Sequence, residues 1–294
     1  MGILDSFKSA ISSVSGISPK LDVNKRFETI KKIGYGTMSE FRVVKDRMHG
    51  NRICGLKLID MEKLAQVEAR WANVAKPSEG EISIQMDSPY IAETYEIGKT
   101  IEGQNYLLVE FVEGFGLNAI ISTNRDIIKP MRLNLIRQGA QAIQSVHDAG
   151  FIHRDICPRN FIVHKAGKFM KLTDFGLSVP NSGVFLQPGN RTGTPNYMAP
   201  ELVRRKNTDV RLDVFAYGVT IYETLTGQLP WPKGDTGNAA LLHEQPPVSI
   251  LQYRPDLDVR LSAAIMFCID PDMENRCPTL QQFLEFIKPV KSEC

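Results

Sequence analysis

Apolar residues recur at two different spacings along the chain. In the first third they gather in short runs of strand length, separated by glycines, prolines and polar residues. Runs of this kind are typical of β-strands. The strands that we expect are residues 27–33, 41–44, 52–59, 91–97 and 106–111.

The later part of the chain shows a helical spacing and one hairpin. Residues spaced by three or four predict a helix from about residue 130 to residue 149. Residues 161–163 and 169–172 flank the turn A-G-K, which predicts a hairpin that returns Asp174 to the side of Asn160. The apolar run 214–225 is too short to span a bilayer, so we expect a buried helix there. The spaced helical residues are Leu133, Ile136, Ala140, Ile143 and His147.

Composition narrows the function classes. The chain has 294 residues, 43% of them hydrophobic, which is ample for a buried core. The net charge of +2 gives no global field that would favour nucleic acid or an anionic membrane as the main partner. Five cysteines without C-x-x-C spacing disfavour a disulfide framework or a zinc site, and we expect a cytoplasmic protein.

The first residues carry a possible lipid signal. The sequence M-G-I-L-D-S matches the pattern for N-myristoylation. The alternative is that the apolar stripe of residues 4–14 docks on its own domain. Residues 12–25 are rich in Ser, Gly and Pro, so residues 1–26 are expected to be an extension and linker. Any membrane association is expected only through this extension.

Candidate chemistry concentrates in residues 153–176. Asp155 can accept a proton from an incoming hydroxyl, and Asn160, five residues on, can offer an amide oxygen to a metal. Asp174 adds a second carboxylate. Such a cluster of oxygen ligands favours Mg²⁺ that carries phosphates.

The motifs in this stretch are H-R-D-x-x-x-x-N followed by D-F-G, and they resemble the catalytic and metal loops of the eukaryotic-type protein kinases. The resemblance covers residues 27–287 and implies an α+β, bilobal fold. The implied parts are a small antiparallel β-rich lobe at residues 27–111, a larger mainly helical lobe at residues 112–287, and a tail at residues 288–294. The implied activity is transfer of the ATP γ-phosphoryl group to serine or threonine hydroxyls of protein substrates.

A glycine-rich hairpin precedes these motifs. The stretch I-G-Y-G-T-M-S-E-F resembles the family's nucleotide-covering loop, with Gly34 and Gly36 in the first two glycine positions and Ser39 in the third. Glycines let backbone N–H groups approach phosphate oxygens. Ile33 borders the loop, and Phe41 is expected to make apolar contact with one face of a purine base.

The resemblance also assigns a phosphate-binding lysine. Lys57 stands in C-G-L-K where the family has V-A-I-K, and it is implied to brace the α- and β-phosphates. Its implied partner is Glu79 or Glu81. Ile82 and Met86 share a helical face with Glu79, which favours Glu79.

The segment between the lobes resembles the family's hinge. By position, the backbone groups of Glu110 and Val112 are implied to meet the adenine edge, and Val109 is implied to border the pocket. Main-chain recognition leaves almost no signature in the sequence.

The segment after D-F-G ends in G-T-P-N-Y-M-A-P-E, which resembles the activation segment of serine/threonine kinases. Candidate phosphorylation sites are Thr192, favoured, together with Ser182 and Thr194. Arg154 is implied to pair with a phosphorylated residue. Thr194 is also implied to bridge toward Asp155.

Two structural links are implied farther along the chain. Asp213 resembles the aspartate that anchors the catalytic-loop backbone, although a plain helix N-cap is compatible with the same residue. Arg276 stands where the family has an arginine that pairs with the glutamate of A-P-E, here Glu201.

The pattern departs from the family at one point in the catalytic loop. Serine/threonine kinases usually carry lysine two residues after the catalytic aspartate, and here that residue is Cys157. Arg159 resembles the arginine of the tyrosine-kinase form and can supply the missing cation. Tyrosine or dual specificity, a pseudokinase scaffold and a small-molecule kinase therefore remain alternatives.

Overall fold

The computed structural model describes residues 20–35, 39–71, 74–189, 191–231 and 239–294. These residues fall into two compact units. The first contains the described residues up to 71 together with Thr94–Phe111, and the second contains Val74–Glu93 and Val112–Cys294. Residues 74–93, which the sequence places in the amino-terminal lobe, thus cluster with the second unit.

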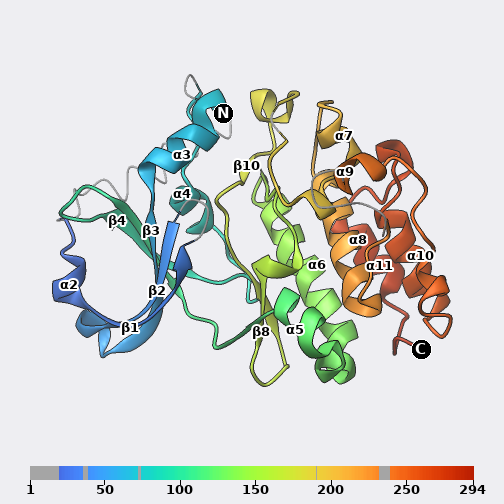
Figure 1. The fold of residues 1–294 in the computed structure, drawn as a ribbon, viewed down its shortest axis with the longest axis horizontal. Helices are drawn as coiled ribbons and strands as arrows, with labels where there is room; N and C mark the ends of the chain where they lie inside the picture. The colour runs from blue at the N-terminus through green and yellow to red at the C-terminus, as the bar shows by residue number, and fades with distance from the viewer. Residues whose placement is uncertain (1–19, 36–38, 72–73, 190, 232–238) are drawn as a thin grey trace. The chain divides into compact units, whose positions relative to one another are not determined.

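The first unit is built on one antiparallel sheet (Figure 1). Its strand order is β1-β2-β3-β5-β4, so β4 and β5 are exchanged relative to chain order. One face buries a cluster that includes Phe27, Val44, Leu56 and Leu108. The strands are β1 (Phe27–Tyr35), β2 (Ser39–Asp46), β3 (Arg52–Ile59), β4 (Thr94–Lys99) and β5 (Asn105–Glu110). The helices are α2 (Val23–Arg26) and α3 (Met61–Glu68).

The segment before β1 is more ordered than the linker that the sequence predicts. Leu21 forms a parallel bridge with Thr100, and its N–H donates to the Lys99 carbonyl at 2.9 Å. Asp22 then caps α2 through the N–H groups of Asn24 and Lys25. The described part of this segment therefore belongs to the sheet.

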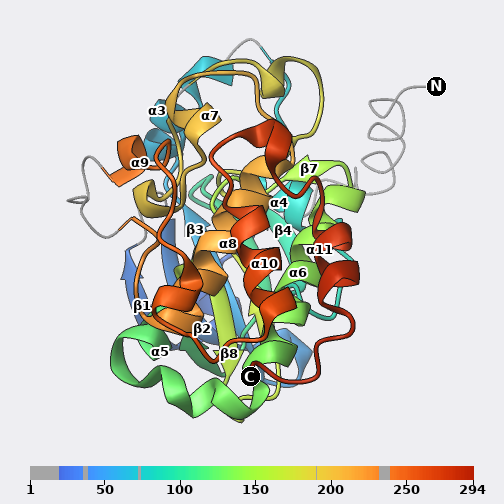
Figure 2. The same cartoon turned by 90° about the vertical axis from the view of Figure 1, so that its right-hand side faces the viewer.

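The second unit is mainly helical. Helix α8 is buried along nearly its whole length, α10 packs on α8, and α11 packs on both α6 and α10 (Figure 2). Its α-helices are α4 (Glu79–Ser83), α5 (Leu117–Asn124), α6 (Arg132–Asp148), α7 (Pro200–Val203), α8 (Arg211–Thr226), α9 (Ala239–Leu242), α10 (Val259–Cys268) and α11 (Leu280–Ile287). Its strands are β6 (Gly114–Gly116), β7 (Phe151–Ile152), β8 (Phe161–His164), β9 (Met170–Leu172) and β10 (Val179–Pro180).

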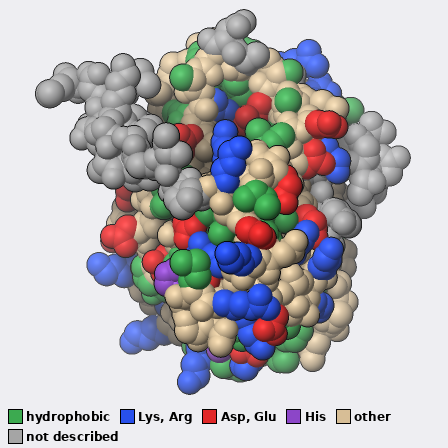
Figure 3. All heavy atoms as spheres, turned by 90° about the vertical axis from the view of Figure 1, so that its left-hand side faces the viewer, with side chains coloured by type: hydrophobic (Ala, Val, Ile, Leu, Met, Phe, Trp, Pro, Cys, Tyr) green, Lys and Arg blue, Asp and Glu red, His purple; other side chains and the backbone are tan. Residues whose placement is uncertain are grey.

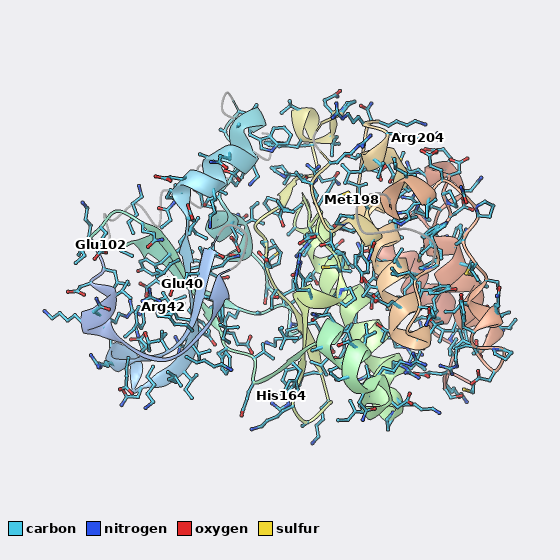
Figure 4. All side chains as sticks on the ribbon, viewed as in Figure 1. Glu40, Arg42, Glu102, His164, Met198 and Arg204 are labelled. Atoms are coloured by element: carbon cyan, nitrogen blue, oxygen red, sulfur yellow. The ribbon has the colours of Figure 1, made fainter. Side chains whose placement is uncertain are left out.

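Most of the elements expected from the pattern are present. Helix α6 corresponds to the helix expected near residues 130–149, and α8 to the buried helix expected at residues 214–225. Strands β8 and β9 form the expected hairpin, and His164, labelled in Figure 4, stacks on Phe169 beside its turn with ring centroids 4.6 Å apart. The α+β fold class is confirmed.

The expected strand at residues 91–97 is wrong in its first half. Strand β4 begins only at Thr94, whereas Ile91 forms a parallel bridge with Leu172 of β9. The Ala92 N–H donates to the Leu172 carbonyl at 2.9 Å. The first residues of this apolar run thus pair with a strand of the second unit, and the later ones form a strand of the first. The spacing of apolar residues cannot show where one pairing ends and the other begins.

Charge and hydropathy of the described residues agree with the composition. On the face drawn in Figure 3, basic and acidic side chains are interspersed. Within the part of the chain that the structure describes, no helix has the length and apolar character needed to cross a membrane. The N-myristoylation pattern lies outside the described residues.

Candidate active site

A buried aspartate at the start of α8 holds the backbone of the catalytic loop. Asp213, 1% exposed, accepts hydrogen bonds from the N–H groups of His153 at 2.7 Å and Arg154 at 2.9 Å. Arg154 has a φ of +67°, a conformation that costs free energy in a residue other than glycine. The anchoring role predicted for Asp213 is confirmed, and its two bonds stabilise this strained turn.

His147 of α6 completes this anchor. Its Nε2 lies 3.0 Å from Asp213 Oδ2. Burial alone raises the pKa of a carboxyl group, but the hydrogen bond and charge of His147, with the contacts from His153, bring the pKa of Asp213 below its ordinary value. Asp213 is therefore ionised at neutral pH.

His153 joins the catalytic loop to the segment that carries Asp174. Its Nδ1 accepts the Asp155 N–H at 3.4 Å, which leaves Nε2 to donate to the Thr173 carbonyl at 3.3 Å. Its ring packs against Phe175 with centroids 5.1 Å apart. The two predicted catalytic loops are thus joined by one side chain.

Asn160 is oriented by Asp155. Its amide nitrogen donates to the Asp155 carbonyl at 2.7 Å and to Asp155 Oδ2 at 3.1 Å. Both residues are at most 9% exposed. Because the nitrogen is engaged by Asp155, the amide oxygen is directed away from that carboxylate, which suits a hard cation such as Mg²⁺.

Asp174 follows the hairpin in a special backbone conformation. The Thr173 N–H donates to the Asn160 carbonyl at 2.9 Å, so the hairpin brings the two segments together as predicted. Asp174 itself has a φ of +66° and an exposed side chain. Strained, exposed carboxylates of this kind are frequent at functional sites, and the donor set of Asp174 and Asn160 fits magnesium.

The activation segment reaches the same carboxylate. The Thr194 hydroxyl donates to Asp155 Oδ1 at 2.7 Å, which confirms the bridge predicted for Thr194. Arg159 Nη2 lies 3.2 Å from Asp155 Oδ2 and 3.1 Å from Thr194 Oγ1. Cys157 is buried beside them, and burial followed by the Asp155 charge raises the pKa of its thiol to about 11.

A glycine permits this close approach. Gly193 has a φ of +125°, and a Cβ there would lie 2.9 Å from the Arg154 carbonyl oxygen. Any other residue would push the segment away from the catalytic loop. Gly193 was not among the predicted residues, although its place directly before Thr194 is a usable signal.

The end of the activation segment is fixed by a buried ion pair. Arg276 donates from Nη1 to Glu201 Oε1 at 2.7 Å and from Nη2 to Oε2 at 3.0 Å. Both side chains are almost fully buried. The predicted pair is confirmed, and its bidentate geometry is the strongest form of such a contact.

The first unit carries the predicted nucleotide residues. Lys57 is half-buried on β3, opposite Phe41 of β2 and Leu107 of β5. A Cβ on Gly55 would lie 2.4 Å from the Phe41 ring and 2.9 Å from Val109. Phe41 and Val109 therefore both lie close to Gly55, which was not among the predicted residues.

The other residues predicted to bind the nucleotide lie on β1, on β5 and at the start of the second part of the helical unit. Ile33 and Gly34 lie near the end of β1, and Glu110 ends β5. Val112 is buried at the start of the second part of the helical unit. Gly36 lies outside the described residues.

The two candidate partners of Lys57 differ in their local contacts. Glu81 forms a capping box at the start of α4, where its Oε2 accepts the Ser78 N–H and hydroxyl, both at 2.8 Å. Glu79 has no part in that box. Capping thus engages the Glu81 carboxylate at the start of its own helix.

Known proteins match nearly the whole chain. A family model described as the protein kinase domain matches residues 27–286. The probable serine/threonine-protein kinase PknB of Lactococcus lactis is 28% identical over 88% of this chain and 41% of its own length. The serine/threonine-protein kinase PknB of Mycolicibacterium smegmatis is 27% identical over 87% of this chain and 41% of its own. PknB of Mycobacterium leprae is 26% identical over 87% and 42%.

This chain spans about two fifths of the length of those curated relatives. The family match covers far more than half of this chain, and it includes the loop that Asp213 anchors and the segment that Gly193 and Thr194 dock onto it. The chain belongs to the protein kinase family.

Proposed function

We propose that this chain is an ATP-dependent protein kinase that phosphorylates serine and threonine hydroxyls of protein substrates. The observation that carries the proposal is the assembly around Asp155, in which Thr194 and Asn160 fix both oxygens of one carboxylate. The names of the relatives support the same specificity.

The reaction needs a base at the acceptor hydroxyl. Asp155 orients that hydroxyl and takes its proton while the new bond to the γ-phosphorus forms. The bond between the γ-phosphorus and the bridging oxygen breaks, and its electron pair leaves with ADP. Asp155 suits this task because its two neighbours hold the carboxylate in one orientation.

The remaining residues bind the nucleotide. Asn160 and Asp174 hold Mg²⁺, which neutralises phosphate charge when ATP is bound. Lys57 braces the α- and β-phosphates. Phe41 and Val109 offer apolar surface to the adenine, while backbone groups of Glu110 and Val112 offer hydrogen bonds to its edge.

The test is phosphoryl transfer by the purified chain. The parent should label a generic protein substrate from γ-labelled ATP and magnesium, and Asp174→Ala should lower labelling by at least about 10²-fold because it removes a metal ligand. Arg260→Ala, a change of an exposed charge on α10, is the matched control. Undiminished labelling by Asp174→Ala would overturn the assignment, and an inactive parent would favour the pseudokinase alternative.

A further inference from the structure

A buried histidine holds the backbone of the activation segment at Met198, which is labelled in Figure 4. His243 directly follows α9 and is 2% exposed, and its Nδ1 lies 2.7 Å from the Met198 carbonyl oxygen. A carbonyl oxygen can only accept a hydrogen bond, so Nδ1 carries the proton and donates. Burial lowers the pKa of His243, against a smaller opposing effect of the Met198 carbonyl, so the ring is neutral at neutral pH.

Aromatic neighbours fix the direction of this hydrogen bond. The centroid of the His243 ring lies 4.4 Å from that of Trp231 and 5.6 Å from that of Phe215 on α8. Trp231 is itself held, because its Nε1 donates to the Gln245 carbonyl at 2.9 Å. Rings packed this closely restrict rotation of the imidazole. The Nδ1–H group therefore stays directed at Met198.

The segment that ends at Met198 begins at the catalytic carboxylate. Two backbone hydrogen bonds, 2.9 and 3.3 Å long, close the short 3₁₀ turn that links Thr194 to Met198. The Thr194 hydroxyl donates to Asp155 Oδ1 at 2.7 Å. The turn 194–198 is thus held at one end by Asp155 and at the other by His243, and α9 packs against it.

Loss of the histidine donor would leave a buried acceptor without a partner. Met198 is 9% exposed, and within the part of the chain that the structure describes its carbonyl accepts a hydrogen bond from His243 alone. A buried carbonyl without a donor is disfavoured by about tenfold or more in an equilibrium constant. The turn would relieve this cost by moving the carbonyl toward water, and its position would change.

We propose that His243 is a positioning residue for the protein substrate, because through the Met198 carbonyl it holds the turn 194–198 beside Asp155. The inference rests on the proposed function, which brings the acceptor hydroxyl to Asp155. Thr194 contacts the same carboxylate, so the substrate segment that bears the hydroxyl must pass next to this turn. His243 therefore acts on the affinity for the protein substrate, whereas ATP binding is assigned to other residues.

The experiment separates the hydrogen bond of His243 from the packing of its ring. His243→Phe keeps an aromatic ring and removes the donor, whereas His243→Asn removes the ring and keeps a short side chain with an N–H donor. Trp231→Phe is the matched control, since it removes a hydrogen bond to a backbone carbonyl in the same aromatic cluster but not at the activation segment. The measured quantities are kcat and KM for dephosphorylated casein and for γ-labelled ATP.

The variants should differ in one kinetic constant. His243→Phe should raise KM for casein about tenfold, because a turn that has moved loses contacts with the protein substrate. Its kcat and its KM for ATP should stay within about threefold of the parent values. His243→Asn should restore KM for casein to within about threefold of the parent, and Trp231→Phe should leave it there.

Hydrogen–deuterium exchange gives a readout that needs no activity. The amides of Tyr197 and Met198 close the turn, and in His243→Phe they should exchange at least about fivefold faster than in the parent. In His243→Asn and Trp231→Phe they should exchange at the parent rate.

The outcomes are distinguishable. A casein KM for His243→Phe within about threefold of the parent, or equal effects of His243→Phe and His243→Asn, would overturn the positioning role and leave the kinase assignment intact. A parent that transfers no phosphate would overturn the proposed function, while exchange would still decide whether His243 holds the turn. Circular dichroism and thermal melting establish that each variant is folded, and His243→Leu, which also lacks the donor, replaces His243→Phe if that variant does not fold.

Discussion

Phe41 and Gly55 are matched in size on neighbouring strands. The Phe41 ring occupies the space that a Cβ on Gly55 would need, at 2.4 Å, and a methyl carbon of Val109 would lie 2.9 Å from the same Cβ. Both distances are shorter than real Cβ contacts allow. The Phe41 ring would therefore have to move to admit a side chain at position 55, although the Gly55 backbone itself has no unusual φ.

Gly55→Ala should destabilise the first unit by about 1 to 3 kcal/mol, the usual cost of overpacking a well-packed site. Adding Phe41→Val should remove most of that cost, because the smaller side chain frees the space. Urea unfolding measures the effect through Trp71, which lies in this unit, in a Trp231→Phe background. Equal losses for the single and double changes would contradict the size match.

Individual site residues could be predicted from the sequence where they belong to a known motif. Asp155, Asn160 and Thr194 lie together as the motifs predict. Gly55 could not be predicted in the same way, because its role depends on strand register with Phe41. The capping role of Glu81 was available from S-x-x-E, the spacing of a capping box.

Among the elements, the segment after α11 is integrated into the helical unit. Glu293 accepts two bonds from Arg132 of α6, both at 2.6 Å, and its carbonyl accepts the Asp258 N–H at 2.6 Å. Arg132 and Glu293 are both buried. The segment that the sequence predicts to be a tail thus neutralises a buried charge 161 residues away.

Glu293→Ala should destabilise the second unit by about 3 to 5 kcal/mol, because it leaves the Arg132 guanidinium buried without its carboxylate. Glu285→Ala, which removes a carboxylate that is 58% exposed, should cost less than about 1 kcal/mol. Urea unfolding followed through Trp231 in a Trp71→Phe background compares the two. Similar losses for both variants would show that the buried pair is not critical.

A further buried ion pair, between Arg26 and Asp46, ties α2 to the sheet. Arg26 donates to Asp46 at 3.0 and 2.7 Å and to Glu96 at 2.8 and 2.9 Å. Burial raises the pKa of Asp46, but the stronger combined effect of Arg26 and His49 lowers it to about 2, from 3.8 for an unperturbed group.

Because the folded pKa of Asp46 lies below the unfolded value, its contribution to stability is complete above about pH 4 and is lost as the pH falls toward 2. The stability difference between the parent and Asp46→Asn should shrink by about 1 kcal/mol between pH 5 and pH 3. Urea unfolding in the Trp231→Phe background measures it. Glu28→Gln, which removes an exposed pair with Lys45, is the control; a constant difference for Asp46→Asn would contradict the linkage.

Elements were predictable where one periodicity holds over many residues. Helices α6 and α8 and the β8–β9 hairpin agree with the pattern. Helix α3 was not predicted, since its apolar positions are few and polar residues surround them. The predicted start of β4 was wrong because Ile91 pairs with Leu172, which is far away in the sequence.

At the scale of the whole molecule, the sequence predicts the class of fold better than it predicts which residues belong to which of the two units. The β-rich first part and helical second part follow from local patterns. The assignment of residues 74–93 to the helical unit does not, because it depends on contacts such as Ala92 with Leu172. The motifs nevertheless identify the family, since they occur along the chain in the family's order and the family model matches residues 27–286.

The central claim is that the protein transfers phosphate to serine and threonine hydroxyls of a protein substrate. Phosphoamino-acid analysis of a protein substrate after incubation with magnesium, γ-labelled ATP and the parent tests it most directly, with Asp174→Ala as the matched inactive enzyme. Labelled phosphoserine and phosphothreonine, made by the parent and reduced at least about 10²-fold with Asp174→Ala, are the predicted result. Phosphotyrosine alone, or equal labelling by the two proteins, would contradict the account.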